Sequence, residues 1–111
     1  MSRVYSKDSI NEISGGDTDF TKILVQTFLE EIPPDLEGMK DAFKNKDITR
    51  AYQFAHKMKP NLQMFGIELL GDIKKVEAWT KSGGEDSSVA QSMDKIYSVV
   101  SLALQQLQED F

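Results

Sequence analysis

The chain has 111 residues, of which 40% are apolar and 28% are charged, as is usual for a globular domain with one modest core. Its formal net charge of −5 argues against a nucleic-acid-binding or membrane-binding surface, because both need a basic face. The absence of cysteine excludes disulfides, thiol catalysis and thiolate metal sites, and it agrees with a reducing compartment.

No part of the sequence reads as a targeting or membrane segment. Residues 1–8 contain no apolar run that could form a signal peptide. No stretch approaches the roughly 20 apolar residues of a membrane span. We therefore predict a cytoplasmic protein, or a cytoplasmic piece of a longer one, that forms a single domain over residues 1–111.

The first predicted element is a short helix over residues 7–14. Ser6 can cap its N-terminus, since a serine hydroxyl accepts a hydrogen bond from a free N–H of the first turn. Gly15-Gly16 can end it, because glycine adopts the left-handed conformation that closes many helices. The short helix is thus predicted to precede the main fold.

The next element, residues 17–45, is predicted to be helical and interrupted by two prolines. Asp17 can cap a segment that runs to Pro33-Pro34, and a second segment continues from Pro34 to Asn45. The prolines either bend one helix or separate two. The first segment has one predicted apolar stripe, formed by Phe20, Ile23, Leu24, Thr27, Phe28 and Ile32.

The central helix is predicted from Ile48 to about Phe65, with Asp47 as its cap. His56, the only histidine, does not belong to the apolar seam of this helix. At about 100° per residue it projects roughly 130° from the centre of the seam, so its imidazole is predicted to meet water. The seam consists of Ile48, Ala51, Ala55, Met58, Leu62 and Phe65.

Two more helices complete the predicted fold. Gly66 closes the central helix, and the next runs from about Glu68 to Lys81 with Leu69, Leu70, Ile73, Val76 and Trp79 as its apolar members. After possible capping residues at 86–88, the last helix has the seam Val89, Met93, Ile96, Val100, Ala103 and Leu107. The prediction is an all-α fold: an antiparallel four-helix bundle of elements 17–45, 48–65, 67–82 and 87–110, with an additional short N-terminal helix.

The helical neighbours of His56 favour phosphoryl chemistry. Tyr52, Gln53, Lys59, Pro60 and Gln63 lie on its side of the helix, within two turns. A neutral imidazole is a nucleophile that needs no activating base. A lysine about 4 Å from an anion contributes roughly 1 to 4 kcal/mol of attraction. The pattern therefore favours a phosphoryl group carried on His56 beside Lys59.

These residues also carry a family resemblance. Ala55-His56-x-Met58-Lys59, followed by Gly66, closely resembles the central motif of histidine-containing phosphotransfer (HPt) domains. The resemblance implies that His56 accepts a phosphoryl group from an aspartate of one receiver domain and passes it to another, with Lys59 stabilising the group. It implies response-regulator receivers and a hybrid sensor histidine kinase as partners, with Mg²⁺ and the catalytic acids supplied by the receiver. The chain itself is then expected to hold no cofactor or metal, and the single exposed site predicts a monomer.

Pro60 departs from this family pattern, in which glycine is usual. Proline lacks an N–H, so the carbonyl of His56 loses its partner four residues later, and the ring crowds the same carbonyl. Leu62 and Phe65 keep the register of the seam. We therefore predict a helix that bends at Pro60 and does not end there, and we hypothesise that the bend affects access to His56.

Other functions remain as alternatives. The chain could be a helical adaptor that docks a partner without chemistry. It could also be a small helical enzyme with His56 as acid or base, although no partner carboxylate shares its face. A di-iron bundle is excluded, because it requires Glu-x-x-His pairs on two helices and Gln53 stands three residues before the only histidine.

Overall fold

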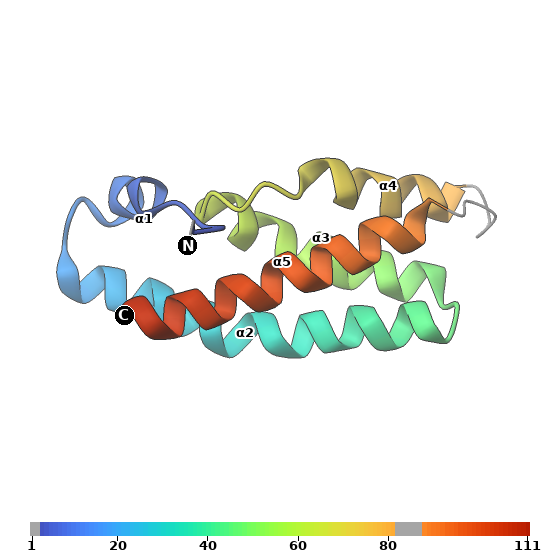
Figure 1. Cartoon of the computed structure of the whole chain (residues 1–111), viewed down its shortest axis with the longest axis horizontal. Helices are drawn as coiled ribbons and strands as arrows, with labels where there is room; N and C mark the ends of the chain where they lie inside the picture. The colour runs from blue at the N-terminus through green and yellow to red at the C-terminus, as the bar shows by residue number, and fades with distance from the viewer. Residues whose placement is uncertain (1–2, 82–87) are drawn as a thin grey trace.

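The computed structural model describes residues 3–81 and 88–111, and this part of the chain folds into five helices without a strand (Figure 1). The all-α bundle with a short N-terminal helix is confirmed. In the described residues no helix is long and apolar enough to cross a membrane. The helices are α1 (Lys7–Ser14), α2 (Thr18–Lys44), α3 (Ile48–Met64), α4 (Leu70–Lys81) and α5 (Val89–Asp110).

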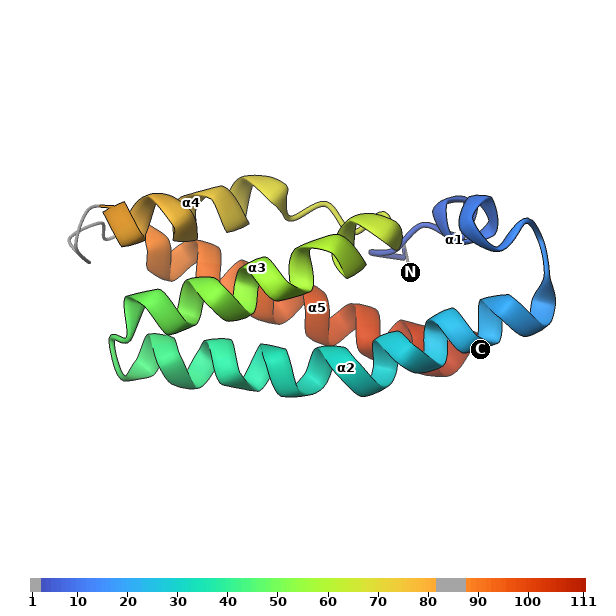
Figure 2. The same ribbon diagram turned by 180° about the vertical axis from the view of Figure 1, so that it is seen from behind.

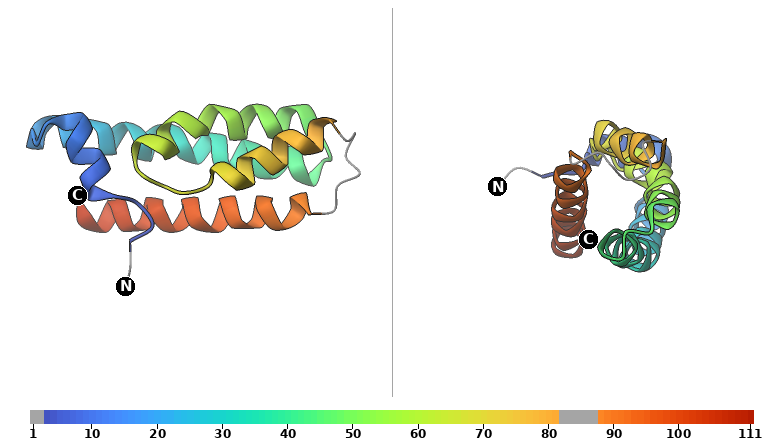
Figure 3. Two further views of the ribbon diagram at one scale, coloured as in Figure 1. Left: turned by 90° about the horizontal axis from the view of Figure 1, so that it is seen from above. Right: turned by 90° about the vertical axis from the view of Figure 1, so that its right-hand side faces the viewer.

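The four longer helices form a closed ring when they are viewed along the bundle (Figure 3). Neighbours around the ring are α2 and α3, α3 and α4, α4 and α5, and α5 and α2. Each helix turns a seam of buried side chains inward, and these seams make one continuous core. The back of the bundle presents α3 between α2 and α4, which leaves the outer face of α3 uncovered (Figure 2).

The predicted caps at the start of the chain are confirmed. The backbone N–H of Ser9 donates to the Ser6 hydroxyl over 3.1 Å, and that of Phe20 donates to the Asp17 carboxylate over 3.1 Å. Gly15 ends α1 with a φ of 63°. Side-chain caps satisfy N–H groups that the first turn of a helix leaves without partners, so α1 and α2 begin where the sequence predicts.

Helix α2 continues through Pro33 and Pro34, so the two prolines lie within one helix. Its buried stripe contains Thr21, Val25, Phe28 and Ile32. The predicted stripe was wrong at three positions, since Phe20 is 42% exposed, Ile23 is 62% exposed and Thr27 is also exposed. The physical reason is the direction in which the core face of α2 points: the buried residues follow the spacing 21, 25, 28 and 32, and the three exposed side chains lie off that stripe. The first turns of α2 project past the end of α5 (Figure 1).

The connection from α3 to α4 is longer than predicted. Helix α4 begins at Leu70, and the carbonyl of Leu69 accepts its first hydrogen bond from the N–H of Ile73 over 3.0 Å. Ile67 and Leu69 are both buried, so residues 67–69 contribute to the core without being helical. Leu70, predicted as a core member, is 39% exposed. Of the predicted caps before α5, residues 86 and 87 lie outside the described residues.

The N-terminal segment is tied to the end of α5 and to the turn after α3. The Val4 N–H donates to the buried Gln106 side chain over 2.9 Å, and the Tyr5 hydroxyl donates to Asp110. Burial and this hydrogen bond raise the pKa of the Tyr5 hydroxyl, and the same bond lowers the pKa of the Asp110 carboxyl. The N–H of Ser6 donates to the carbonyl of Phe65 over 2.8 Å, which places α1 against the α3–α4 turn.

Candidate functional site

The imidazole of His56 lies on the outer face of α3 and is exposed, as the sequence predicts. Its helical neighbours Ala55 and Met58 are both 0% exposed, so they fix the rotation of α3 about its axis. The ring of Tyr52, one turn earlier, lies with its centroid 5.6 Å from that of His56. The histidine is therefore carried on a helix that cannot rotate without exposing core side chains.

The two lysines that follow His56 face different helices. The ammonium of Lys57 lies 3.1 Å from the carboxylate of Asp35 on α2. Lys59 is half-buried on the opposite side, where it lines a depression between α3 and α4. Residues three positions apart lie close together on a helix surface, so Lys59 is on the same side of α3 as His56, while Lys57 is directed toward α2.

Asp35 is a component of this region that the sequence analysis missed. It is only 5% exposed, although its partner Lys57 keeps 70% of its side-chain surface accessible. A signal was present in the sequence: Asp35 follows Ile32 by three residues and precedes Met39 by four, so it lies on the core stripe of α2. A carboxylate on such a stripe needs a cation or hydrogen-bond donors, and Lys57 supplies the cation.

Replacing Lys57 with methionine is expected to lower the free energy of unfolding by about 1–2 kcal/mol, because the buried Asp35 carboxylate loses its cation. Urea denaturation of the wild type and of Lys57→Met measures the loss. A Lys57→Arg variant keeps the charge and serves as the control. The double variant Asp35→Asn/Lys57→Met should recover part of the loss, and a wild-type midpoint for Lys57→Met would contradict the role of the pair.

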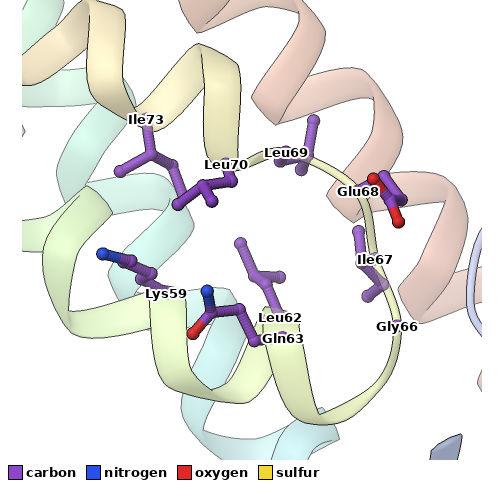
Figure 4. Close-up of a pocket in the computed structure, with 9 residues that line it drawn as sticks. All are labelled: Lys59, Leu62, Gln63, Gly66, Ile67, Glu68, Leu69, Leu70 and Ile73. Atoms are coloured by element: carbon purple, nitrogen blue, oxygen red, sulfur yellow. The ribbon is translucent and has the colours of Figure 1, made fainter.

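The depression beside Lys59 has a volume of about 220 Å³ and is open to solvent (Figure 4). Lys59 and Gln63 from α3 form one wall, Leu70 and Ile73 from α4 form the opposite wall, and Leu62 lies between them. The remaining residues that line it are those of the α3–α4 turn: Gly66, Ile67, Glu68 and Leu69. An apolar hollow with a lysine at its rim thus follows the histidine along the same helix.

Pro60 lies inside α3, and the helix continues beyond it to Met64. The prediction that the helix does not end at Pro60 is therefore confirmed. Since proline has no N–H, the carbonyl of His56 has no helical donor four residues later. The C-terminal half of α3 diverges from α2 in the view of Figure 2. The ring of Phe65, the residue that caps the end of α3, stacks on the ring of Phe28 from α2, with the ring centroids 4.4 Å apart.

The described residues contain no cluster of three or more histidine, cysteine, aspartate or glutamate side chains that could hold a metal ion. The chemistry available at the site is that of one accessible imidazole, a nearby lysine and a tyrosine ring. The fold and this site define a class of protein: a helical bundle that presents a single histidine on its surface.

Comparison with protein families identifies the class. The Hpt domain model matches residues 23–110, and the chain therefore belongs to the Hpt domain family. Compared with curated proteins and with solved structures, the chain shows no significant match. Hpt domains serve phosphotransfer in two-component signalling and interact with receiver and kinase components of phosphorelays. Membership bears out the resemblance that the central motif carries.

Proposed function

We propose that this protein is a phosphorelay intermediate that carries a phosphoryl group on His56 between aspartates of receiver domains. The observation that carries the proposal is the placement of the only histidine: it is exposed on the middle of a helix whose core-facing side chains Ala55 and Met58 are fully buried. A phosphoryl carrier needs such a nucleophile, accessible to two large partners in turn and fixed in position.

The transfer consists of two displacements at phosphorus. An imidazole nitrogen of His56 attacks the phosphorus of a receiver's aspartyl phosphate, so that an N–P bond forms while the P–O bond to the aspartate breaks. The aspartate leaves as a carboxylate, and the proton on the second imidazole nitrogen can pass to water. In the second displacement the second imidazole nitrogen takes a proton back from water, the carboxylate of another receiver attacks the same phosphorus, and the P–N bond breaks so that a neutral imidazole leaves. Each displacement needs its two reacting atoms in line, which favours a rigid, exposed acceptor.

The proposal is tested by incubating the chain with receiver domains that carry a radiolabelled phosphoryl group and measuring the label that is transferred to the chain. A phosphoryl group on His56 should be lost in acid and retained in base, as a phosphoramidate is, whereas an aspartyl phosphate is also lost in base. Peptide mapping should then place the label on the α3 segment that contains the histidine. If no receiver loads the chain but one binds it, the adaptor alternative is favoured.

Lys59 is proposed to stabilise the phosphoryl group on His56. It lies three residues further along α3, on the same side of the helix, so its ammonium is within reach of an anion carried on the imidazole. Its half-buried stem limits the number of conformations that its ammonium can adopt. The proposal takes residues 1–111 as a single domain, which the core cluster that joins all the long helices supports. It also takes the protein to act as a monomer.

A Lys59→Met variant is expected to accept the phosphoryl group about 10-fold more slowly than the wild type, which corresponds to a loss of about 1.4 kcal/mol of electrostatic stabilisation. Methionine keeps the apolar stem that lines the depression, so the change removes mainly the charge. Rapid-quench measurement of phosphoryl transfer from a receiver gives the rate. Lys59→Arg should retain most of the wild-type transfer rate. Equal rates for Lys59→Met and the wild type would show that Lys59 does not stabilise the phosphoryl group.

A further inference from the structure

The depression between α3 and α4 is separate from the proposed phosphoacceptor but begins beside it. Its walls are apolar at Leu62, Leu70 and Ile73, and its volume of about 220 Å³ is of the order of one large apolar side chain. Leu70 is 39% exposed, although it was expected in the core. An exposed leucine at the edge of an apolar hollow is a favourable point for a partner to contact, because both surfaces lose water on binding.

Helix geometry places this hollow on the same side of α3 as His56. At about 100° and 1.5 Å per residue, Gln63 points within about 20° of His56 and lies about 10 Å further along the axis. Lys59, at the near rim, lies about 4.5 Å along the axis. A specific protein interface covers about 800 Å² of each partner, equivalent to a disc about 16 Å in radius. A receiver centred on the histidine therefore covers the hollow.

We infer that the depression lined by Lys59, Gln63, Leu70 and Ile73 is a docking pocket for an apolar side chain of the receiver domain that exchanges a phosphoryl group with His56. The inference rests on the proposed function. Its occupant is the receiver because the pocket is continuous with the site that a receiver must reach and because the family interacts with receivers. Lys59 joins the two regions, since it belongs to both.

The pocket gives the receiver two kinds of contact. Leu70, which is 39% exposed, offers most of the apolar surface, since Leu62 and Ile73 are buried and form the floor and wall behind it; this surface supplies affinity when it is removed from water. Lys59 and Gln63 on the rim offer polar groups, which fix the register of the partner. Anchoring of this kind holds a receiver so that its aspartate meets the imidazole, and the apolar contact at Leu70 becomes a determinant of which receivers bind.

The test is a Leu70→Asp variant of the full chain, assayed with the receiver domain that loads the wild type. Leu70 is the first residue of α4, where an acidic side chain is compatible with the helix, so the variant is expected to fold. We expect its KM for the phosphorylated receiver to rise about 30-fold, the effect of losing a central apolar contact, with kcat within about 2-fold of wild type. Leu70→Met should retain the wild-type KM within about 3-fold.

Two controls separate docking from other effects. Ser98→Asp adds the same charge at an exposed position of α5 and should leave the KM unchanged. Phosphoramidate, a small phosphoryl donor that needs no docking surface, should load His56 at the same rate in the wild type and in Leu70→Asp. Circular dichroism and sedimentation check that Leu70→Asp keeps its helices and its oligomeric state.

The outcomes distinguish this inference from the proposed function. A wild-type KM for Leu70→Asp overturns the docking pocket while loading of His56 still stands. Equal losses with the receiver and with phosphoramidate also overturn it, because they place the effect at the histidine. A change in self-association without a change in KM assigns the pocket to a second copy of the chain and overturns it too. If neither donor loads the wild type, the proposed function fails and the inference fails with it.

Discussion

A His56→Gln variant is expected to accept no phosphoryl group from any receiver that loads the wild type, while it keeps the helical bundle intact. Glutamine has a polar side chain of similar reach and a helix propensity at least as favourable as that of histidine. Because His56 is exposed, the exchange should change the free energy of unfolding by no more than about 0.5 kcal/mol. The amide of glutamine lacks the nucleophilic nitrogen of an imidazole, so only the chemistry is removed.

The measurement pairs transfer of the label with thermal unfolding of both proteins. A folded variant without label, beside a wild type whose label is lost in acid, would establish His56 as the carrier. Label on folded His56→Gln would place the acceptor elsewhere in the chain. A Gln53→Ala variant is a useful control, since Gln53 is exposed three residues earlier on α3 and has no part in the proposed displacement.

Much of this architecture could be predicted from the sequence because it depends on local rules. The caps at Ser6, Asp17 and Asp47 are set by side chains that satisfy the N–H groups of the first turn, and the structure places each where it was expected. The seam of α3 has strict helical spacing, so the outward direction of His56 follows from counting residues. The spacing of residues along the chain was therefore enough to predict both the helices and the exposure of His56.

The features that the sequence did not reveal depend on how helices meet. Ile23 has an apolar side chain at a helical spacing, yet it is 62% exposed because the face of α2 that meets the other helices is the one that carries Thr21, Val25 and Phe28. Leu70 is exposed because Ile67 and Leu69 occupy the core ahead of it. Asp35 lies on the core stripe of α2, but its ion pair with Lys57 forms only because α3 packs beside α2. The hollow beside Lys59 is lined by residues of α3, of α4 and of the turn between them, so no periodicity along one helix could predict it.

Replacing Gly66 with alanine is expected to lower the free energy of unfolding by about 2–4 kcal/mol, for two additive reasons. The φ of Gly66 is 68°, a left-handed conformation that costs an alanine about 1 kcal/mol. A Cβ at this position would also lie 2.6 Å from the Cβ of Ser6 and 3.0 Å from the hydroxyl of Ser9. Urea denaturation measures the loss, and hydrogen exchange should show α1 opening first, since α1 must move to relieve the overlap.

Gly15→Ala is the matched control for this prediction. Its φ of 63° is close to that of Gly66, but an added Cβ would meet nothing within 4 Å. Gly15→Ala should therefore lower the free energy of unfolding only by the cost of the left-handed backbone conformation, about 1 kcal/mol. The difference between the two variants measures the close packing of α1 on the α3–α4 turn, and equal losses would contradict that contact. Because Gly66 also lines the hollow beside Lys59, a large difference would mean that α1 supports the turn on which the proposed docking pocket is built.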